Sequence, residues 1–147
     1  KGGMLIANVI VMQIRNYNDA DFPKLEELLK ATGIYYEPLD KREIFQKKIR
    51  HNPESIIVAE DNGRIVGAVF TIYDPWNSFV YHLGVHPDYR GKGLANGLMD
   101  EAERRLKARG IARPTLFVEE QNSEVVEFYK KRGWFVLYKV FCMEKQL

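Results

Sequence analysis

A run of six residues past the middle of the chain has the composition of a phosphate-binding turn. The run reads Arg90-Gly91-Lys92-Gly93-Leu94-Ala95. The two glycines let the backbone approach a ligand closely, because they have no Cβ atom. The helix expected to follow leaves its first amide N–H groups unpaired, at the positive end of its dipole. A pyrophosphate would satisfy both features. The alternative is that the glycines serve turn geometry alone.

Other phosphate-binding motifs do not fit the spacing. A Walker loop requires GxxxxGK[ST], and the chain contains no such string. The dinucleotide fingerprint would place its third small residue at Asn96, whereas Gly97 comes one position late.

A second segment further along the chain completes a resemblance to a known family. It runs from Asn122 to Tyr129 and is followed by Arg132-Gly133-Trp134. Together with the stretch at 83–87, the two segments resemble the GNAT superfamily of N-acetyltransferases over roughly residues 12–140. The family signature is Arg or Gln, two residues, Gly, one residue, then Gly or Ala. Here it is matched by Arg90, Gly93 and Ala95.

The resemblance implies an α/β fold and acetyl-CoA as co-substrate. The expected sheet is mixed, with about six or seven strands and about four helices. Two neighbouring parallel strands, 80–85 and 115–118, would splay apart so that the pantetheine arm pairs with the first of them. The amides of 91–95 would hold the pyrophosphate. The residues that the resemblance assigns to acetyl-CoA are Leu83, Gly84, Val85, Arg90, Gly91, Lys92, Gly93, Leu94, Ala95 and Asn122.

The implied reaction is direct transfer of the acetyl group to a primary amine, which could be a peptide N-terminus, a lysine or a small amine. By resemblance, Tyr129 is the general acid that protonates the leaving thiolate. An amide near Val85 would support the developing oxyanion. The alternative for Tyr129 is that it packs the last helix beside Phe128.

The general base is not obvious from the sequence. Strand positions where relatives carry one hold Phe79, Tyr81 and Phe117. Strict alternation would place His82 on the opposite face of its strand, so a core or cofactor-side role is favoured over its role as a base. Glu119 could act through water. His82 and Glu119 are the two candidates.

A site without a strong base favours a weakly basic acceptor. A lysine amine with a pKa of about 10.4 is rarely neutral at pH 7, which costs roughly 4–5 kcal/mol. An α-amine near pKa 8 loses only about 1.4 kcal/mol. The sequence therefore points toward an α-amine or another weakly basic amine as acceptor, or toward a water chain that carries the proton away. The pocket walls are expected among Tyr35, Tyr36, Glu37, Asp40, Asp74 and Trp76.

Two other functions remain compatible with the sequence. One is a domain of the same fold that senses acyl-CoA without turnover. The other is an interaction domain in which Gly91 and Gly93 serve the fold only.

The elements that would position these residues alternate regularly. Asn18 or Asp19 is expected to cap the first helix, and Asp40 with Glu43 to form a capping box for the second. Asn62-Gly63 is a hairpin signal. The expected strands cover 9–15, 55–60, 64–73, 78–85, 115–118 and 134–143, and the expected helices cover 19–30, 40–50, 93–109 and 123–131.

Composition limits the class of protein. The chain has 147 residues, and its 22 basic and 20 acidic side chains leave a formal charge of +2. That balance does not favour nucleic acid or an anionic membrane as a partner. Cys142 is the only cysteine, so an internal disulfide is excluded and a cytoplasmic setting fits.

The ends of the chain carry two further expectations. Residues 1–11 are interpreted as an N-terminal extension or cloning remnant, and 12–147 as a single GNAT-like domain. The apolar stretch at 4–12 is too short to span a bilayer. The apolar stretch at 135–143 could pair across two chains, which would give a homodimer.

Overall fold

The computed structural model describes residues 12–147, so the expectation for residues 1–11 lies outside the described part. The chain forms two compact units, one up to Leu116 and one over Phe117–Leu147. The first holds the sheet and three helices, and the second holds one helix.

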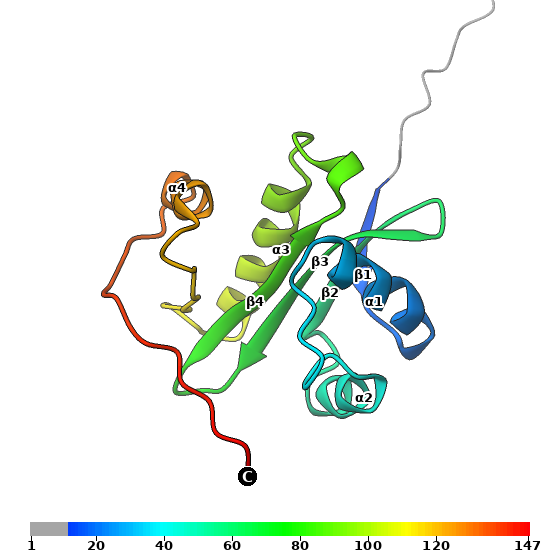
Figure 1. The fold of residues 1–147 in the computed structure, drawn as a ribbon, viewed down its shortest axis with the longest axis horizontal. Coiled ribbons are helices and arrows are strands. Elements are labelled where there is room, and N and C mark those ends of the chain that lie inside the picture. Colours follow the sequence, from blue (N-terminus) through cyan, green and yellow to red (C-terminus); the bar gives the residue numbers. More distant parts are fainter. Residues whose placement is uncertain (1–11) are drawn as a thin grey trace, which may run out of the picture. The chain divides into compact units, whose positions relative to one another are not determined.

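The first unit is built from an antiparallel sheet and its connecting helices (Figure 1). The strand order is β1-β2-β3-β4, so neighbours in the sequence are neighbours in space. The strands are β1 (Gln13–Asn16), β2 (Ile56–Asp61), β3 (Arg64–Tyr73) and β4 (Ser78–Val85). The helices are α1 (Phe22–Ala31), α2 (Arg42–His51) and α3 (Leu94–Ala108), with short 3-10 turns η1 (Asp19–Asp21) and η2 (Pro87–Tyr89).

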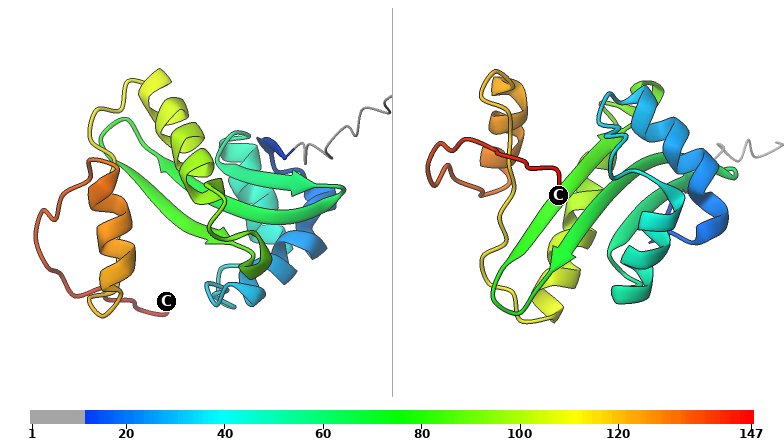
Figure 2. Two further views of the ribbon diagram at one scale, coloured as in Figure 1. Left: turned by 90° about the horizontal axis from the view of Figure 1, so that it is seen from above. Right: turned by 60° about the horizontal axis from the view of Figure 1, so that its bottom comes forward.

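The helices cover both faces of this sheet (Figure 2). A Cβ added to Gly67 of β3 would meet Leu98 of α3 at 2.9 Å, so that glycine faces α3. A Cβ added to Gly84 of β4 would meet Ile34 at 2.8 Å, in the segment that follows α1. The α3 face and the α1–α2 face are therefore distinct surfaces of the same strands.

Each face buries apolar side chains from its helices. On the α1–α2 face, Leu25, Leu28, Leu29 and Phe45 join a core with residues of β2 and β3. Leu98 is fully buried on the other face. Full burial of such a side chain contributes roughly 1.5–3 kcal/mol. These contacts hold the helices against the sheet whose last strand, β4, leads into the site.

Two local features expected from the sequence, a helix cap and a hairpin turn, are confirmed by the structure. Asn18 caps η1 and forms a capping box with Asp21. Asn62 and Gly63 both have positive φ, at 47° and 77°, which is the backbone that a tight hairpin turn requires.

The capping role expected of Asp40 is wrong. The second helix begins at Arg42, and its N-cap is Lys41 without a side-chain cap. The carboxylate of Asp40 instead accepts the N–H of Tyr36 at 2.7 Å and contacts His82. The side chain is therefore turned toward the sheet and away from the helix start.

The second unit contains α4 (Ser123–Lys131). Gly133, with a φ of 90°, follows the end of the helix, and the N–H of Trp134 bonds to the carbonyl of Tyr129 at 3.1 Å. This local turn agrees with the expected helix end.

The expected sheet was too large. Within residues 12–147 the sheet has four strands, all antiparallel, where six or seven in a mixed sheet were expected. The expected strand at 115–118 supplies one parallel bridge, between Thr115 and Phe79. The expected strand at 134–143 is absent from the described chain. Apolar alternation alone does not make a strand, because a strand also needs a paired neighbour.

None of the helices in the described part of the chain is long and apolar enough to cross a membrane.

Candidate active site

The turn into α3 has the geometry of an anion-binding loop. Gly91 and Gly93 have φ values of 74° and 79°, which non-glycine residues rarely adopt. Gly93 is the N-cap of α3, and no side chain among the described residues caps the helix there. A Cβ at either glycine would meet nothing within 4 Å. The glycines are thus required by backbone conformation, and the surface above them is open to a ligand.

The basic side chains of the turn are anchored by their surroundings. Arg90 donates from Nε to the carbonyl of Val85 at 3.1 Å, which ties the turn to the end of β4. Lys92 lies over the ring of Tyr89, 5.3 Å from its centroid. The Tyr89 hydroxyl donates to Asp61 at 2.5 Å, and this hydrogen bond raises the pKa of Tyr89. Both cations therefore stay beside the glycines.

The outer edge of β4 is hydrogen-bonded to another segment at the beginning of the strand, but a different arrangement follows near its end. At its beginning, Val80 N–H bonds to the carbonyl of Thr115 at 2.9 Å, and Thr115 N–H bonds to Ser78 at 2.8 Å. Further along, Gly84 pairs with Ala68 of β3. The N–H of His86 donates to the carbonyl of Val66 at 2.8 Å, so His86 directs its peptide groups toward β3. Because these groups alternate in direction along a strand, Gly84 also faces β3, and Leu83 and Val85 direct theirs to the outer edge. This orientation would let them pair with an extended ligand.

A β-bulge lies between these two parts of β4. Phe70 pairs with Tyr81 and Ala68 with Gly84, so β4 has one residue more than β3 in this interval. The irregular backbone of the bulge lies at His82, which has a φ of 52°. Its ring lies 5.0 Å from that of Phe70.

The expected orientation of His82, opposite Tyr81, is wrong. His82 contacts Phe70 and Asp40, and the paired Tyr81 lies on the same face as Phe70. The cause is the bulge, which interrupts the alternation on which the expectation depended.

Asp40 is the functional candidate whose role sequence reasoning missed. Its carboxylate oxygens lie 3.0 and 2.9 Å from Nε2 of His82, and the residue is only 3% exposed. The two residues are 42 positions apart. No local pattern could have paired them.

Three of the predicted site residues lie in the second unit. Tyr129 is buried, and its ring contacts those of Phe128 and Trp134 at 5.1 and 5.9 Å. Asn122 is the N-cap residue of α4 and makes no side-chain cap. Glu119 is exposed and accepts a hydrogen bond from Gln121 at 2.7 Å.

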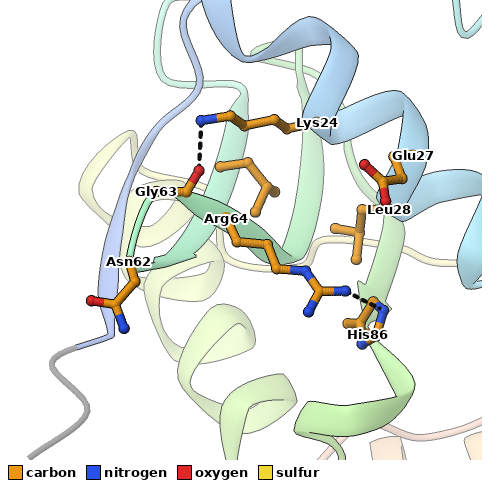
Figure 3. Close-up of a pocket in the computed structure, with 8 residues that line it drawn as sticks. Lys24, Glu27, Leu28, Asn62, Gly63, Arg64 and His86 are labelled. Carbon is orange, nitrogen blue, oxygen red and sulfur yellow. Dashed lines mark hydrogen bonds between the residues drawn. The ribbon is translucent and has the colours of Figure 1, made fainter.

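A pocket of about 330 Å³ opens on the α1 side of the β2–β3 hairpin (Figure 3). Lys24 and Arg64 line it, and Arg64 contacts Nε2 of His86 at 2.9 Å. It includes none of residues 90–95. The turn at the start of α3 is therefore a separate feature of the surface.

Comparison with known proteins shows the family of this chain. The family model described as the acetyltransferase (GNAT) family matches residues 14–134. An acetyltransferase of Yersinia pestis is 39% identical over 120 residues, which cover 82% of this chain and 85% of the relative. An acetyltransferase of Sodalis glossinidius is 34% identical over 136 residues, covering 92% and 96%. This chain belongs to the GNAT family and is an acyltransferase enzyme.

The fold is also that of solved members. The PaiA N-acetyltransferase of Thermoplasma acidophilum, in complex with coenzyme A, superposes with a TM-score of 0.73 at 23% identity, over 82% of this chain and 87% of that one. The family uses acetyl-CoA, which is the co-substrate of this protein. The open glycine turn, its two cations and the outward-facing peptide groups of β4 fit a ligand with a pyrophosphate and an amide-bearing arm.

Proposed function

We propose that the protein transfers the acetyl group of acetyl-CoA directly to a primary amine. The observation that carries this proposal is the open turn at Gly91 and Gly93, beside the outward-facing peptide groups of Leu83 and Val85. The turn would hold the pyrophosphate and the strand edge would hold the pantetheine arm, so that the thioester lies near the end of β4. The family model matches residues 14–134, a range that includes every residue assigned a role below.

The roles of the site residues follow from this arrangement. The amides and cations at Arg90, Gly91, Lys92, Gly93, Leu94 and Ala95 neutralise the pyrophosphate, while Asn122 bonds the pantetheine amides. The N–H at Val85 supports the oxyanion that forms during attack. Tyr129 protonates the departing thiolate. Glu119 is the weaker candidate for the base, because it is exposed and bonded to Gln121.

Competing acceptors are distinguished by an acceptor panel. The purified protein is given acetyl-CoA with one of three amines: a lysine-free peptide with a free N-terminus, an N-terminally blocked peptide containing lysine, or a polyamine. Release of free thiol and the mass of the acceptor are followed together. A blocked, lysine-free peptide is the control.

We expect one acceptor class to gain an acetyl group in step with thiol release. Thiol release at the rate of the control with all three amines would contradict the proposal, since it would leave only hydrolysis.

A further inference from the structure

The backbone of His82 is held in an unfavourable conformation. Its φ of 52° lies in the left-handed region, which is sterically unfavourable for an L-residue with a side chain. Among residues 12–147, Asn62 is the other non-glycine residue with positive φ, and it lies in a hairpin turn that requires it. His82 lies within a strand. Conformations of this kind persist only where the surroundings enforce them, and they are frequent at functional sites.

The ring of His82 is fixed by two neighbours from different elements. The Phe70 ring of β3 packs against it at 5.0 Å, and the buried carboxylate of Asp40 contacts Nε2 with both oxygens. Asp40 is itself oriented by the N–H of Tyr36. Ile34 approaches β4 two residues further on, at Gly84. The segment after α1 thus lies over the end of β4 and fixes the imidazole against it.

This arrangement determines which nitrogen can accept a proton. A carboxylate is an acceptor only, so Nε2 of His82 carries the hydrogen that faces Asp40. In the neutral ring, Nδ1 then keeps its lone pair. The His82 side chain is 21% exposed, so the ring is within reach of a ligand while its partner is buried.

We infer that His82 is the general base for the acceptor amine and that Asp40 is its positioning residue. The inference rests on the proposed function. His82 precedes Leu83 and Val85, whose outward peptide groups are assigned to the pantetheine arm and, for the Val85 N–H, to the oxyanion. The base therefore lies on the strand that positions the acetyl carbon.

The proton and the bonds balance in this step. The amine nitrogen forms a bond to the acetyl carbon, and its proton passes to Nδ1 of His82. The carbon–sulfur bond breaks, and the thiolate takes a proton from Tyr129. His82 then loses its proton to solvent and Tyr129 regains one, so both side chains return to their starting states.

His82→Asn is the most direct test. Asparagine tolerates positive φ better than other non-glycine residues, so it adds little strain to the backbone at this position. With the amine that wild type acetylates fastest, we expect kcat to fall about 100-fold or more, as for loss of a general base. The affinity for acetyl-CoA should stay unchanged. His51→Asn, at the exposed end of α2, is the matched control and should turn over like wild type.

Asp40→Asn tests the positioning role through a double-mutant cycle with His82→Asn. Alone, Asp40→Asn should lower kcat without changing the affinity for acetyl-CoA. In the His82→Asn background it should cause no further fall, because the base that Asp40 positions is already gone. A purely structural role for Asp40 would lower kcat equally in both backgrounds.

His82→Gly keeps the test decisive if asparagine disturbs the fold, because glycine accepts positive φ without strain. Added imidazole should restore part of its activity. Turnover of His82→Asn within a few-fold of wild type would overturn the inference and leave the proposed function standing. If wild type turned over none of the amines, the proposed function would be contradicted, and the inference with it.

Discussion

The turn from Arg90 to Ala95 and the pair of His82 and Asp40 are built in opposite ways. The turn is continuous in sequence, and its shape comes from two glycines with positive φ and the start of α3. The pair joins residues 42 positions apart, and its shape depends on a bulge against β3 and on the segment after α1. Donor binding should therefore depend on local backbone conformation, whereas positioning of the base should depend on tertiary packing.

The largest effect should come from a third component, Tyr129, in the second unit. Tyr129→Phe removes the hydroxyl proposed to protonate the thiolate. We expect kcat to fall by about 10²–10³-fold, since general acids contribute 10²–10⁴-fold. Acetyl-CoA affinity, measured by calorimetry, should not change. Tyr138→Phe in the same unit is the matched control, and equal rates for the two variants would contradict the role of Tyr129 as the general acid.

A smaller effect on kcat is expected when a residue that packs against His82 is changed and the donor site is left intact. Phe70→Leu keeps an apolar side chain in the core but removes the ring that supports His82. We expect kcat to fall about 5-fold, because small displacements of a catalytic group are costly, and acetyl-CoA affinity to stay the same. Stability should fall by less than about 1.5 kcal/mol.

Phe22→Leu is the control for this change. The ring of Phe22 packs against that of Phe45, with 5.8 Å between their centroids. The ring that packs against His82 is instead that of Phe70. Equal losses of kcat in both variants would mean that general loosening of the core, and not the contact with His82, sets the rate.

The smallest effect should be on stability alone. Lys48 of α2 donates to the carbonyl of Thr71 at 2.6 Å, and burial lowers its pKa to about 8. An unfolded lysine has a pKa of about 10.4, so above pH 8 the unfolded chain binds more protons than the folded one. The contribution of Lys48 to the free energy of unfolding should therefore rise with pH between about 8 and 10, and be lost as pH falls.

Lys48→Met should remove this rise. The free energy of unfolding is measured with urea at about pH 8 and pH 10 for both proteins. Its increase with pH should be larger in wild type than in the variant, by of order 1–2 kcal/mol. Lys47→Met, at an exposed neighbouring position, should behave like wild type. A variant with the wild-type pH dependence would show that Lys48 does not titrate in this range.

The same contrast explains what the sequence could predict. The hairpin at Asn62-Gly63, the cap at Asn18 and the glycine turn before α3 are local, and their residue types specify their geometry. Strict alternation failed at His82, because the bulge is determined jointly by β3 and β4. A capping box is equally plausible for Asp40 from the sequence, since an aspartate can either cap a helix or accept a hydrogen bond from a distant side chain.

The extent of the sheet was also beyond local prediction. Residues 134–143 have the apolar composition of a strand but form none in the structure. A strand is stabilised by pairing and by packing across the sheet, and neither is encoded in the segment itself.

The most direct test of the donor site compares two glycines of one helix. Gly93 and Gly110 lie at opposite ends of α3 with φ values of 79° and 83°, and a Cβ at either meets nothing within 4 Å. Gly93→Val and Gly110→Val should therefore introduce similar backbone strain. In calorimetric titrations with acetyl-CoA, we predict that Gly93→Val binds about 100-fold more weakly than wild type, as expected for loss of one or two charge-assisted hydrogen bonds. Gly110→Val should bind like wild type. Equal affinity of both variants for acetyl-CoA would contradict the assignment of the turn as the pyrophosphate site.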